Sequence, residues 1–110
     1  METFKAKKDR FSKARGGPTR FLQISCAKCG AFVAVYQKDG PGSLKRMYID
    51  RIFSPEALVG LIGLPMKKLT PLSCAKCAHV IGVPFLYEEE DRPSFRLFEG
   101  AVSKKIIKIK

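Results

Sequence analysis

The sequence predicts a mainly β fold, a small β-rich or α+β domain with one short helix. Segments rich in β-branched and aromatic residues follow both cysteine pairs and recur towards the C-terminus. Clusters of Gly, Pro and acidic residues separate them, at Lys38–Ser43 and Glu88–Pro93, and predict turns. Helix-start signals occur at one place, after residue 53. The 110 residues suit one domain.

The strand predictions follow side-chain alternation. In Phe32–Gln37 alternate residues point to opposite faces, and His79–Tyr87 combines β-branched and aromatic residues. Pro84 cannot donate a ladder hydrogen bond, so it indicates an edge strand or a bulge. In the terminal segment, Ile107 and Ile109 are expected to point inward, with Lys108 and Lys110 outward on an edge strand. The further strands expected are Leu44–Ile49, Ser94–Glu99 and Lys104–Lys110.

One helix is predicted after Ser54. Ser54 is a good N-cap, Pro55 suits the first helical position, and Glu56 suits the positive end of the helix dipole. Leu58, Leu61 and Ile62 form an apolar stripe at helical spacing, which predicts a core-facing side. The residues that end the element are Gly63 and Pro65.

The chain divides into a basic arm, residues 1–19, and a single zinc-stapled β-rich domain, residues 20–110. The first 20 residues contain seven Lys or Arg against two acids, with Gly and Pro at Ala14–Thr19. Such an arm is either a polyanion-binding segment or a solvated terminus without a role. The longest apolar run, Ala57–Met66, is about half of a membrane span, which takes about 20 residues. We therefore expect an intracellular protein in the reducing cytoplasm. The alternative is a mitochondrial presequence, which the Arg- and Lys-rich N-terminus favours and Glu2 and Asp9 oppose.

All four cysteines belong to two copies of the pentapeptide SCAKC, at Ser25–Cys29 and Ser73–Cys77. The similarity extends over Arg20–Val35 and Lys68–Val83, at an offset of 48 residues. Two copies are too few for a solenoid, which needs about three. The repeat instead predicts a pseudo-symmetric pair of hairpins that face one another.

Each CxxC places two sulfurs on one tight turn, where both reach one metal ion. In a reducing compartment, paired cysteines serve as metal ligands or catalytic thiols more often than as disulfides. Gly30 after the first pair suits a turn with positive φ, whereas Ala78 at the second pair costs about 1 kcal/mol or requires a different turn. The alternatives are a redox dithiol, a disulfide pair or unrelated structural thiols. The duplicated spacing favours zinc over all three.

Two CxxC turns on hairpins, closed by one ion, resemble the zinc ribbon. The resemblance covers the segments around Cys26–Val35 and Cys74–Val83, and it implies one structural Zn²⁺. The gap departs from compact sites, because 44 residues separate Cys29 from Cys74 where about 15–20 are usual. The turn, strand and helix predicted between them indicate a larger domain stapled by zinc. The ligands that the resemblance implies are Cys26, Cys29, Cys74 and Cys77.

Nothing else in the sequence indicates catalysis. Four thiolates leave a zinc ion no open position for a substrate. Four thiolates and one Zn²⁺ carry a net charge of −2, which Lys28 and Lys76, inside the two pairs, can offset. His79 can replace a ligand, but with four cysteines present a place at the surface or beside the ligands is favoured. The chain has one His, no serine-centred motif and no glycine-rich phosphate loop, so we expect no enzyme.

A formal net charge of +11 favours polyanionic partners. The stretch Tyr36–Arg51 mixes cations with tyrosines, as RNA-binding surfaces do, although an ordinary charged hairpin has the same composition. The only predicted helix is apolar, so we expect RNA or a ribonucleoprotein and not a specific DNA site. The alternative is a zinc-ribbon protein-interaction or structural module that docks on a larger complex, where an acidic surface of the partner protein would receive the basic chain. The candidate nucleic-acid residues are Tyr36, Lys38, Lys45, Arg46, Tyr48 and Arg51.

Overall fold

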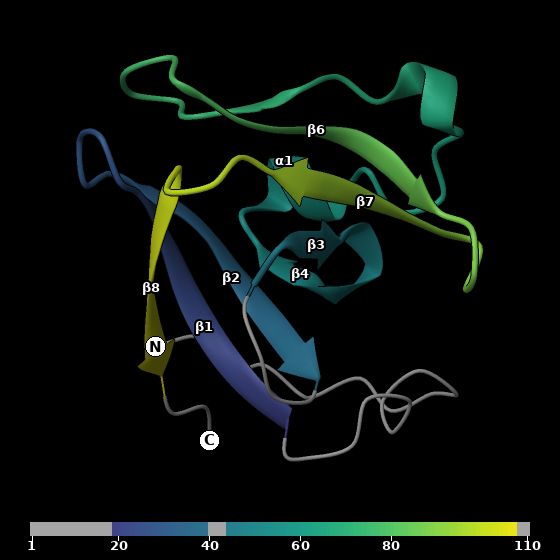
Figure 1. Ribbon diagram of the computed structural model, residues 1–110, viewed down its shortest axis with the longest axis horizontal. Coiled ribbons are helices and arrows are strands. Elements are labelled where there is room, and N and C mark those ends of the chain that lie inside the picture. The colour runs from purple at the N-terminus through teal and green to yellow at the C-terminus, as the bar shows by residue number, and fades with distance from the viewer. Residues whose placement is uncertain (1–18, 40–43, 108–110) are drawn as a thin grey trace.

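The computed structural model describes residues 19–39 and 44–107. Within these ranges the chain forms two four-stranded sheets, in the orders β4-β2-β1-β8 and β3-β7-β6-β5 (Figure 1). Every strand pair is antiparallel. The mainly β prediction is confirmed.

The first sheet contains β1 (Thr19–Cys26), β2 (Phe32–Asp39), β4 (Ile52–Ser54) and β8 (Val102–Ile107). The second sheet contains β3 (Arg46–Tyr48), β5 (Leu72–Ser73), β6 (Val80–Tyr87) and β7 (Arg92–Leu97). The helical elements are α1 (Glu56–Val59) and the 3₁₀ turns η1 (Ile49–Arg51) and η2 (Met66–Lys68).

The hydrophobic core draws on both sheets. Ile24 and Ile52 of the first sheet and Met47, Ile81 and Phe95 of the second are almost inaccessible to solvent and belong to one cluster. Residues 33–37 of β2 are all buried, so this strand is covered on both faces. The two sheets therefore share one core.

The predicted hairpin pair is present. β1 pairs with β2 around the first CxxC, and β5 pairs with β6 around the second. Each hairpin lies in a different sheet. Residues far apart in the chain therefore meet at the ends of these two hairpins.

The predicted helix is shorter than expected and begins later. Ser54 does not cap it, because Ser54 is the last residue of β4 and pairs with Val35 in the sheet. Pro55 is the N-cap, and α1 has a single turn that ends at the C-cap Gly60. Strand pairing thus overrides the local capping preference of the serine. The apolar stripe packs at the margin of the core: Leu58 and Leu61 contact it, whereas Ile62 is 42% exposed.

Pro84 lies where β6 becomes an edge strand. β5 has two residues, and its last partner along β6 is Gly82, so β6 has no neighbour among the described residues on that side from Val83 onward. This absence permits a proline, whose nitrogen donates no hydrogen bond. The edge-strand prediction at Pro84 is confirmed.

Other predicted elements are found with shifted bounds. β3, β7 and β8 replace the expected strands Leu44–Ile49, Ser94–Glu99 and Lys104–Lys110. β8 is an edge strand of the first sheet, with Ile107 partly buried. Thr19 is the first residue of β1, one residue before the expected boundary. Residues 1–18, residues 40–43 of the predicted turn, and Lys108, Ile109 and Lys110 lie outside the described residues.

Among the described residues, no helix has the length and apolar character needed to cross a membrane.

Candidate metal centre

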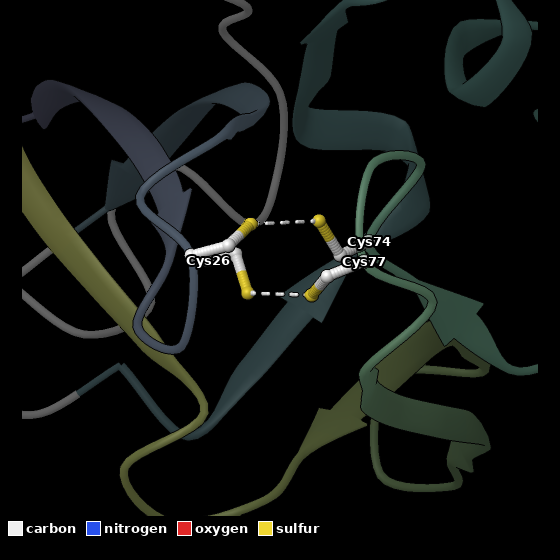
Figure 2. A group of neighbouring side chains, drawn as sticks. Cys26, Cys74 and Cys77 are labelled. Carbon is white, nitrogen blue, oxygen red and sulfur yellow. Dashed lines mark hydrogen bonds between the residues drawn. The ribbon is translucent and has the colours of Figure 1, made fainter.

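The four cysteines converge where the two hairpins meet. Their sulfur atoms all lie within 4.8 Å of one another. Figure 2 shows Cys26 of the β1–β2 hairpin facing Cys74 and Cys77 of the other hairpin. Cys26 and Cys74, the first cysteine of each pair, are buried, whereas Cys29 and Cys77 are more accessible. The repeat therefore brings together one four-cysteine cluster, as the sequence predicted.

The first cysteine turn, Cys26–Ala31, is closed by two backbone hydrogen bonds. The N–H of Cys26 donates to the carbonyl oxygen of Ala31 at 2.8 Å, and the N–H of Gly30 donates to the carbonyl of Cys26 at 2.8 Å. These bonds hold both sulfurs of the pair on one side of the turn, as a chelating turn requires.

The second cysteine turn, Cys74–His79, repeats the same two bonds. The N–H of Cys74 donates to the carbonyl of His79 at 2.9 Å, and that of Ala78 to the carbonyl of Cys74 at 2.9 Å. His79 thus takes part through its backbone, and its side chain is not in the cluster of metal-binding groups. The two copies of the sequence repeat therefore form turns with the same backbone hydrogen bonds.

Gly30 and Ala78 occupy the same place and the same conformation. Their φ angles are +79° and +64°, both in the left-handed region. Glycine adopts that region freely, whereas for alanine it costs about 1–2 kcal/mol. The sequence left two alternatives for Ala78, a strained backbone or a different turn. The structure shows the same turn as at Gly30, with a strained backbone at Ala78.

The sulfur spacing fits one tetrahedral ion. The Sγ atoms of Cys26 and Cys77 are 3.8 Å apart, and those of Cys29 and Cys74 are 3.5 Å apart. Zn–S bonds of about 2.3 Å at tetrahedral angles place sulfurs about 3.8 Å apart. A disulfide requires about 2.05 Å, and all four cysteines are free. The donor set and its spacing therefore suit one metal ion, with zinc the best match for four thiolates.

The cluster also needs a cation for electrostatic reasons. Backbone N–H groups of Cys77 and Lys76 lower the pKa of Cys74 to about 6, which favours its thiolate. For Cys29, the N–H of Ala31 lowers the pKa, but desolvation and the neighbouring cysteines outweigh it and raise the pKa to about 11. Four sulfurs this close cannot all ionise without a positive charge among them.

A metal bound here closes a long-range link between the sheets. Two ligands come from the hairpin of the first sheet and two from the hairpin of the second. Lys28 and Lys76 lie inside the two turns and are exposed to solvent. A shell of four protein ligands is typical of structural sites.

The six residues selected from the sequence as a nucleic-acid patch meet around one cavity of about 180 Å³. They come from β2, the segment before β3, β3 itself and η1. Arg92 of β7 also lines this cavity and was not predicted. The residues are Tyr36, Lys38, Lys45, Arg46, Tyr48 and Arg51.

Three of these six residues are buried, namely Tyr36, Arg51 and Tyr48, and the exposed fraction of Tyr48 is 7%. Tyr36 is 2% exposed, and its hydroxyl accepts a hydrogen bond from the N–H of Tyr48 at 2.9 Å. Arg51 is 1% exposed, and its Nε donates to Asp39 Oδ2 at 2.9 Å. Stacking by Tyr36 and phosphate contact by Arg51 therefore do not fit the structure. Both residues support the fold, while Lys45 remains exposed at the surface.

The sequence analysis did not predict two arginine–tyrosine stacking contacts next to this cavity. The Arg92 guanidinium lies 3.8 Å from the ring centre of Tyr48, and that of Arg46 lies 4.2 Å from the ring centre of Tyr87. Tyr87 and Arg92 are cross-strand partners in the β6–β7 hairpin. The turn predicted at Glu88–Pro93 could have indicated this pairing, because residues that flank a hairpin turn become cross-strand neighbours.

No protein-family model, curated protein or solved structure matches this chain. What the fold and the site define is a small β-rich domain with a candidate four-cysteine metal site between two sheets. The function has to be inferred from the residues themselves.

Proposed function

We propose that this protein is a non-catalytic zinc module that binds nucleic acid, preferring RNA or a ribonucleoprotein to a specific DNA site. In this proposal zinc fixes the two sheets relative to each other, and the surface of the second sheet receives the polyanion. The zinc part is supported by the four-cysteine cluster and its sulfur spacing. The binding part rests on charge and on the arrangement of cations and aromatic rings.

The observation that carries the binding part is one face of the second sheet. Strand register puts Arg46, Arg96 and Val83 directly opposite one another across β3, β7 and β6. Directly paired residues point to the same face of a sheet. The next two rows continue the face with Tyr48, Ser94 and Phe85, and then with Arg92 and Tyr87. We call this the cation–aromatic face: Arg46, Tyr48, Phe85, Tyr87, Arg92 and Arg96.

Side chains on the cation–aromatic face contact one another. Besides the Arg92–Tyr48 and Arg46–Tyr87 pairs, the Arg96 guanidinium lies 5.9 Å from the ring centre of Phe85. Guanidinium planes and aromatic rings are the groups on which unpaired bases stack, and cations also contact phosphates. Tyr48 and Arg92 are buried, and Arg92 is ion-paired with Asp50 and Glu90, so these two support the face from below. The members that reach solvent are Arg46, Phe85, Tyr87 and Arg96. A net charge of +11 adds long-range attraction for a polyanion.

RNA is preferred to a specific DNA site because the described part of the chain has no recognition helix. Its helical elements, α1, η1 and η2, have three or four residues each. An α-helix that reads the major groove needs several turns with polar side chains on one side. A sheet face with cations and rings suits single-stranded or structured RNA better.

Titration of zinc-loaded protein with fluorescein-labelled oligonucleotides tests the proposal. Single-stranded RNA, single-stranded DNA of the same sequence and the DNA duplex are compared by anisotropy at several salt concentrations. We expect binding that weakens with salt, by a slope of about −0.7 per phosphate contacted on single strands. Absence of binding to all three at low salt contradicts the proposal.

A protein-docking function is the second candidate. It is favoured by the apolar stripe near α1, where Leu58 and Leu61 are only half-buried and Ile62 is exposed. An affinity pull-down with and without nuclease separates the two functions. Partners that vanish with nuclease support nucleic-acid binding, and partners that persist support docking on protein.

A further inference from the structure

A second and larger cavity, of about 1160 Å³, lies beside the cation–aromatic face. β6, β7 and the start of β8 line it, together with the β7–β8 connection and residues 44–46. Figure 1 shows β7 and β8 running in different directions from this connection. Three residues of the cation–aromatic face, Arg46, Phe85 and Arg96, also line the cavity. We call this cavity the β7–β8 groove.

Positive charge dominates the β7–β8 groove. Four cations line it against one acid, Glu99. Within residues 19–39 and 44–107, Lys45, Arg96 and Lys104 form no ion pair. Uncompensated like charges in a concave surface repel one another and attract an anion. The cations are Lys45, Arg46, Arg96 and Lys104.

An aromatic ring stands at the wall of the groove. Phe98 is 49% exposed, although burial of such a ring is normally favourable. Its backbone is held in place: the N–H of Phe98 donates to the carbonyl of Ile81 at 2.9 Å, and its own carbonyl accepts from Ala101 at 3.1 Å. Phe98 is therefore a ring presented to solvent by a fixed turn, with Phe85 of β6 lining the same groove.

We propose that the β7–β8 groove binds single-stranded nucleic acid, with bases stacked on Phe98 and Phe85 and phosphates paired with Lys45, Arg96 and Lys104. The inference rests on the proposed nucleic-acid function. It adds where the nucleic acid binds and that the bound form is single-stranded. Unpaired bases are favoured because bases in a duplex already stack on each other and leave no face for a phenyl ring. An acidic peptide would satisfy the lysines and the arginine but would leave both rings without a stacking partner.

The test uses the full chain loaded with zinc and labelled ten-nucleotide probes, oligouridine and oligodeoxythymidine. Phe98→Ala removes one stacking ring, and we expect affinity for both probes to fall about fivefold to a hundredfold with the salt slope unchanged. The double variant Arg96→Gln with Lys104→Gln should lower affinity and reduce the salt slope by about 1.4, since two cations no longer neutralise phosphates.

Matched controls separate the groove from general surface effects. Phe32→Ala removes a ring of similar exposure, 47%, from β2 in the other sheet. Lys67→Gln with Lys68→Gln removes the same charge from the exposed turn η2. We expect Phe32→Ala to bind within about twofold of wild type and the lysine pair to reduce affinity less than the groove pair does. Zinc content and thermal unfolding show whether each variant is folded.

Ultraviolet crosslinking of the wild-type protein to oligouridine gives a readout that needs no variant. Crosslinked peptides should contain Phe85 or Phe98. Suppose that wild type binds nucleic acid, that the groove variants bind like their controls, and that the crosslinks map to other residues. The proposal that the β7–β8 groove is the binding site is then wrong, while the proposed function stands. Equal affinity for duplex, or tighter binding of a polyglutamate peptide, also overturns the groove. No binding of any nucleic acid overturns both.

Discussion

Cys26 and Cys77 are 51 positions apart in the chain, yet their sulfur atoms lie 3.8 Å apart at the junction of the two sheets. Strand ladders hold each sheet together internally, but within residues 19–39 and 44–107 no strand of one sheet pairs with a strand of the other. The shared core, the cysteine cluster and side-chain contacts such as the hydrogen bond from the N–H of Tyr48 in β3 to the hydroxyl of Tyr36 in β2 therefore join them. Because the two turns repeat the same hydrogen bonds, neither pair has a privileged role in such a junction.

Replacement of Cys26 or of Cys74 by Ser should harm the protein about equally. Each change removes one buried ligand from a shared shell, so bound zinc should fall well below one per chain and thermal stability should drop in both variants. Metal analysis and thermal unfolding measure this, and cobalt substitution should give the visible absorption of a tetrahedral thiolate site. A strong effect of only one CxxC would favour a redox dithiol instead.

The separate substitutions Gly30→Ala and Ala78→Gly should change the free energy of unfolding in opposite directions. Both residues have positive φ, and an added Cβ atom at Gly30 would meet nothing within 4 Å, so the effect there is conformational and not steric. We expect Ala78→Gly to stabilise and Gly30→Ala to destabilise by about 1 kcal/mol each. Chemical denaturation of zinc-loaded protein measures both. Destabilisation by Ala78→Gly would contradict strain at that turn.

Removal of the Arg51 side chain should destabilise the fold strongly. Asp39 accepts hydrogen bonds from Arg51, Gln37 and Thr19 in a buried site. Arg51→Met leaves the carboxylate without its cation, which costs about 3–5 kcal/mol for a buried pair. Chemical denaturation of zinc-loaded protein measures this cost.

A double-mutant cycle isolates the contribution of this ion pair. Asp39→Asn combined with Arg51→Met should cost less than the sum of the two single changes, because no charge is then left buried alone. Lys105→Met on the exposed side of β8 is the control and should change stability by less than about 0.5 kcal/mol. Full stability of Arg51→Met would show that Asp39 does not depend on the pair.

Stability should fall in alkali partly because of Tyr36. Burial of the ring raises the pKa of Tyr36 above its ordinary value of about 10. The folded state therefore keeps this proton at a pH where the unfolded state has released it. The contribution is complete below about pH 10 and decreases as pH rises beyond it, by up to about 1.4 kcal/mol per pH unit.

Tyr36→Phe identifies this contribution. The variant lacks the hydroxyl that accepts the N–H of Tyr48, so it should be less stable by about 1–3 kcal/mol at neutral pH. Its stability should decline less steeply than that of wild type above about pH 10. Parallel pH profiles from chemical denaturation would show that Tyr36 ionises as easily in the folded state as in the unfolded one.

The parts that sequence reasoning predicted are those set by local signals. The CxxC repeat, the two hairpins and the ligand set depend on short spacings that few other structures share. The helix at Ser54 was misjudged because its cap competes with a strand partner, Val35, which lies 19 positions earlier in the chain. Long-range pairing of that kind leaves no mark in a local pattern.

The binding surface was predicted only in part for the same reason. Cations and tyrosines within Tyr36–Arg51 stood out, but burial decides which of them reach solvent, and burial of Tyr36 and Arg51 depends on distant residues. Arg96 and Phe98 did not stand out, because the groove that contains them forms only when β7 turns into β8. Register across β3, β7 and β6 assembles the rest of the face.

The basic N-terminal residues give a last prediction, based on charge alone. Residues 1–18 contain six Lys or Arg and two acids, so their removal lowers the net charge without touching a described element. If they bind phosphates, the truncated protein should retain its zinc and its thermal unfolding but bind single strands more weakly. Its slope of log affinity against log salt should be flatter by about 0.7 for each phosphate that these residues neutralise. An unchanged slope would mean that the folded domain alone neutralises the phosphates.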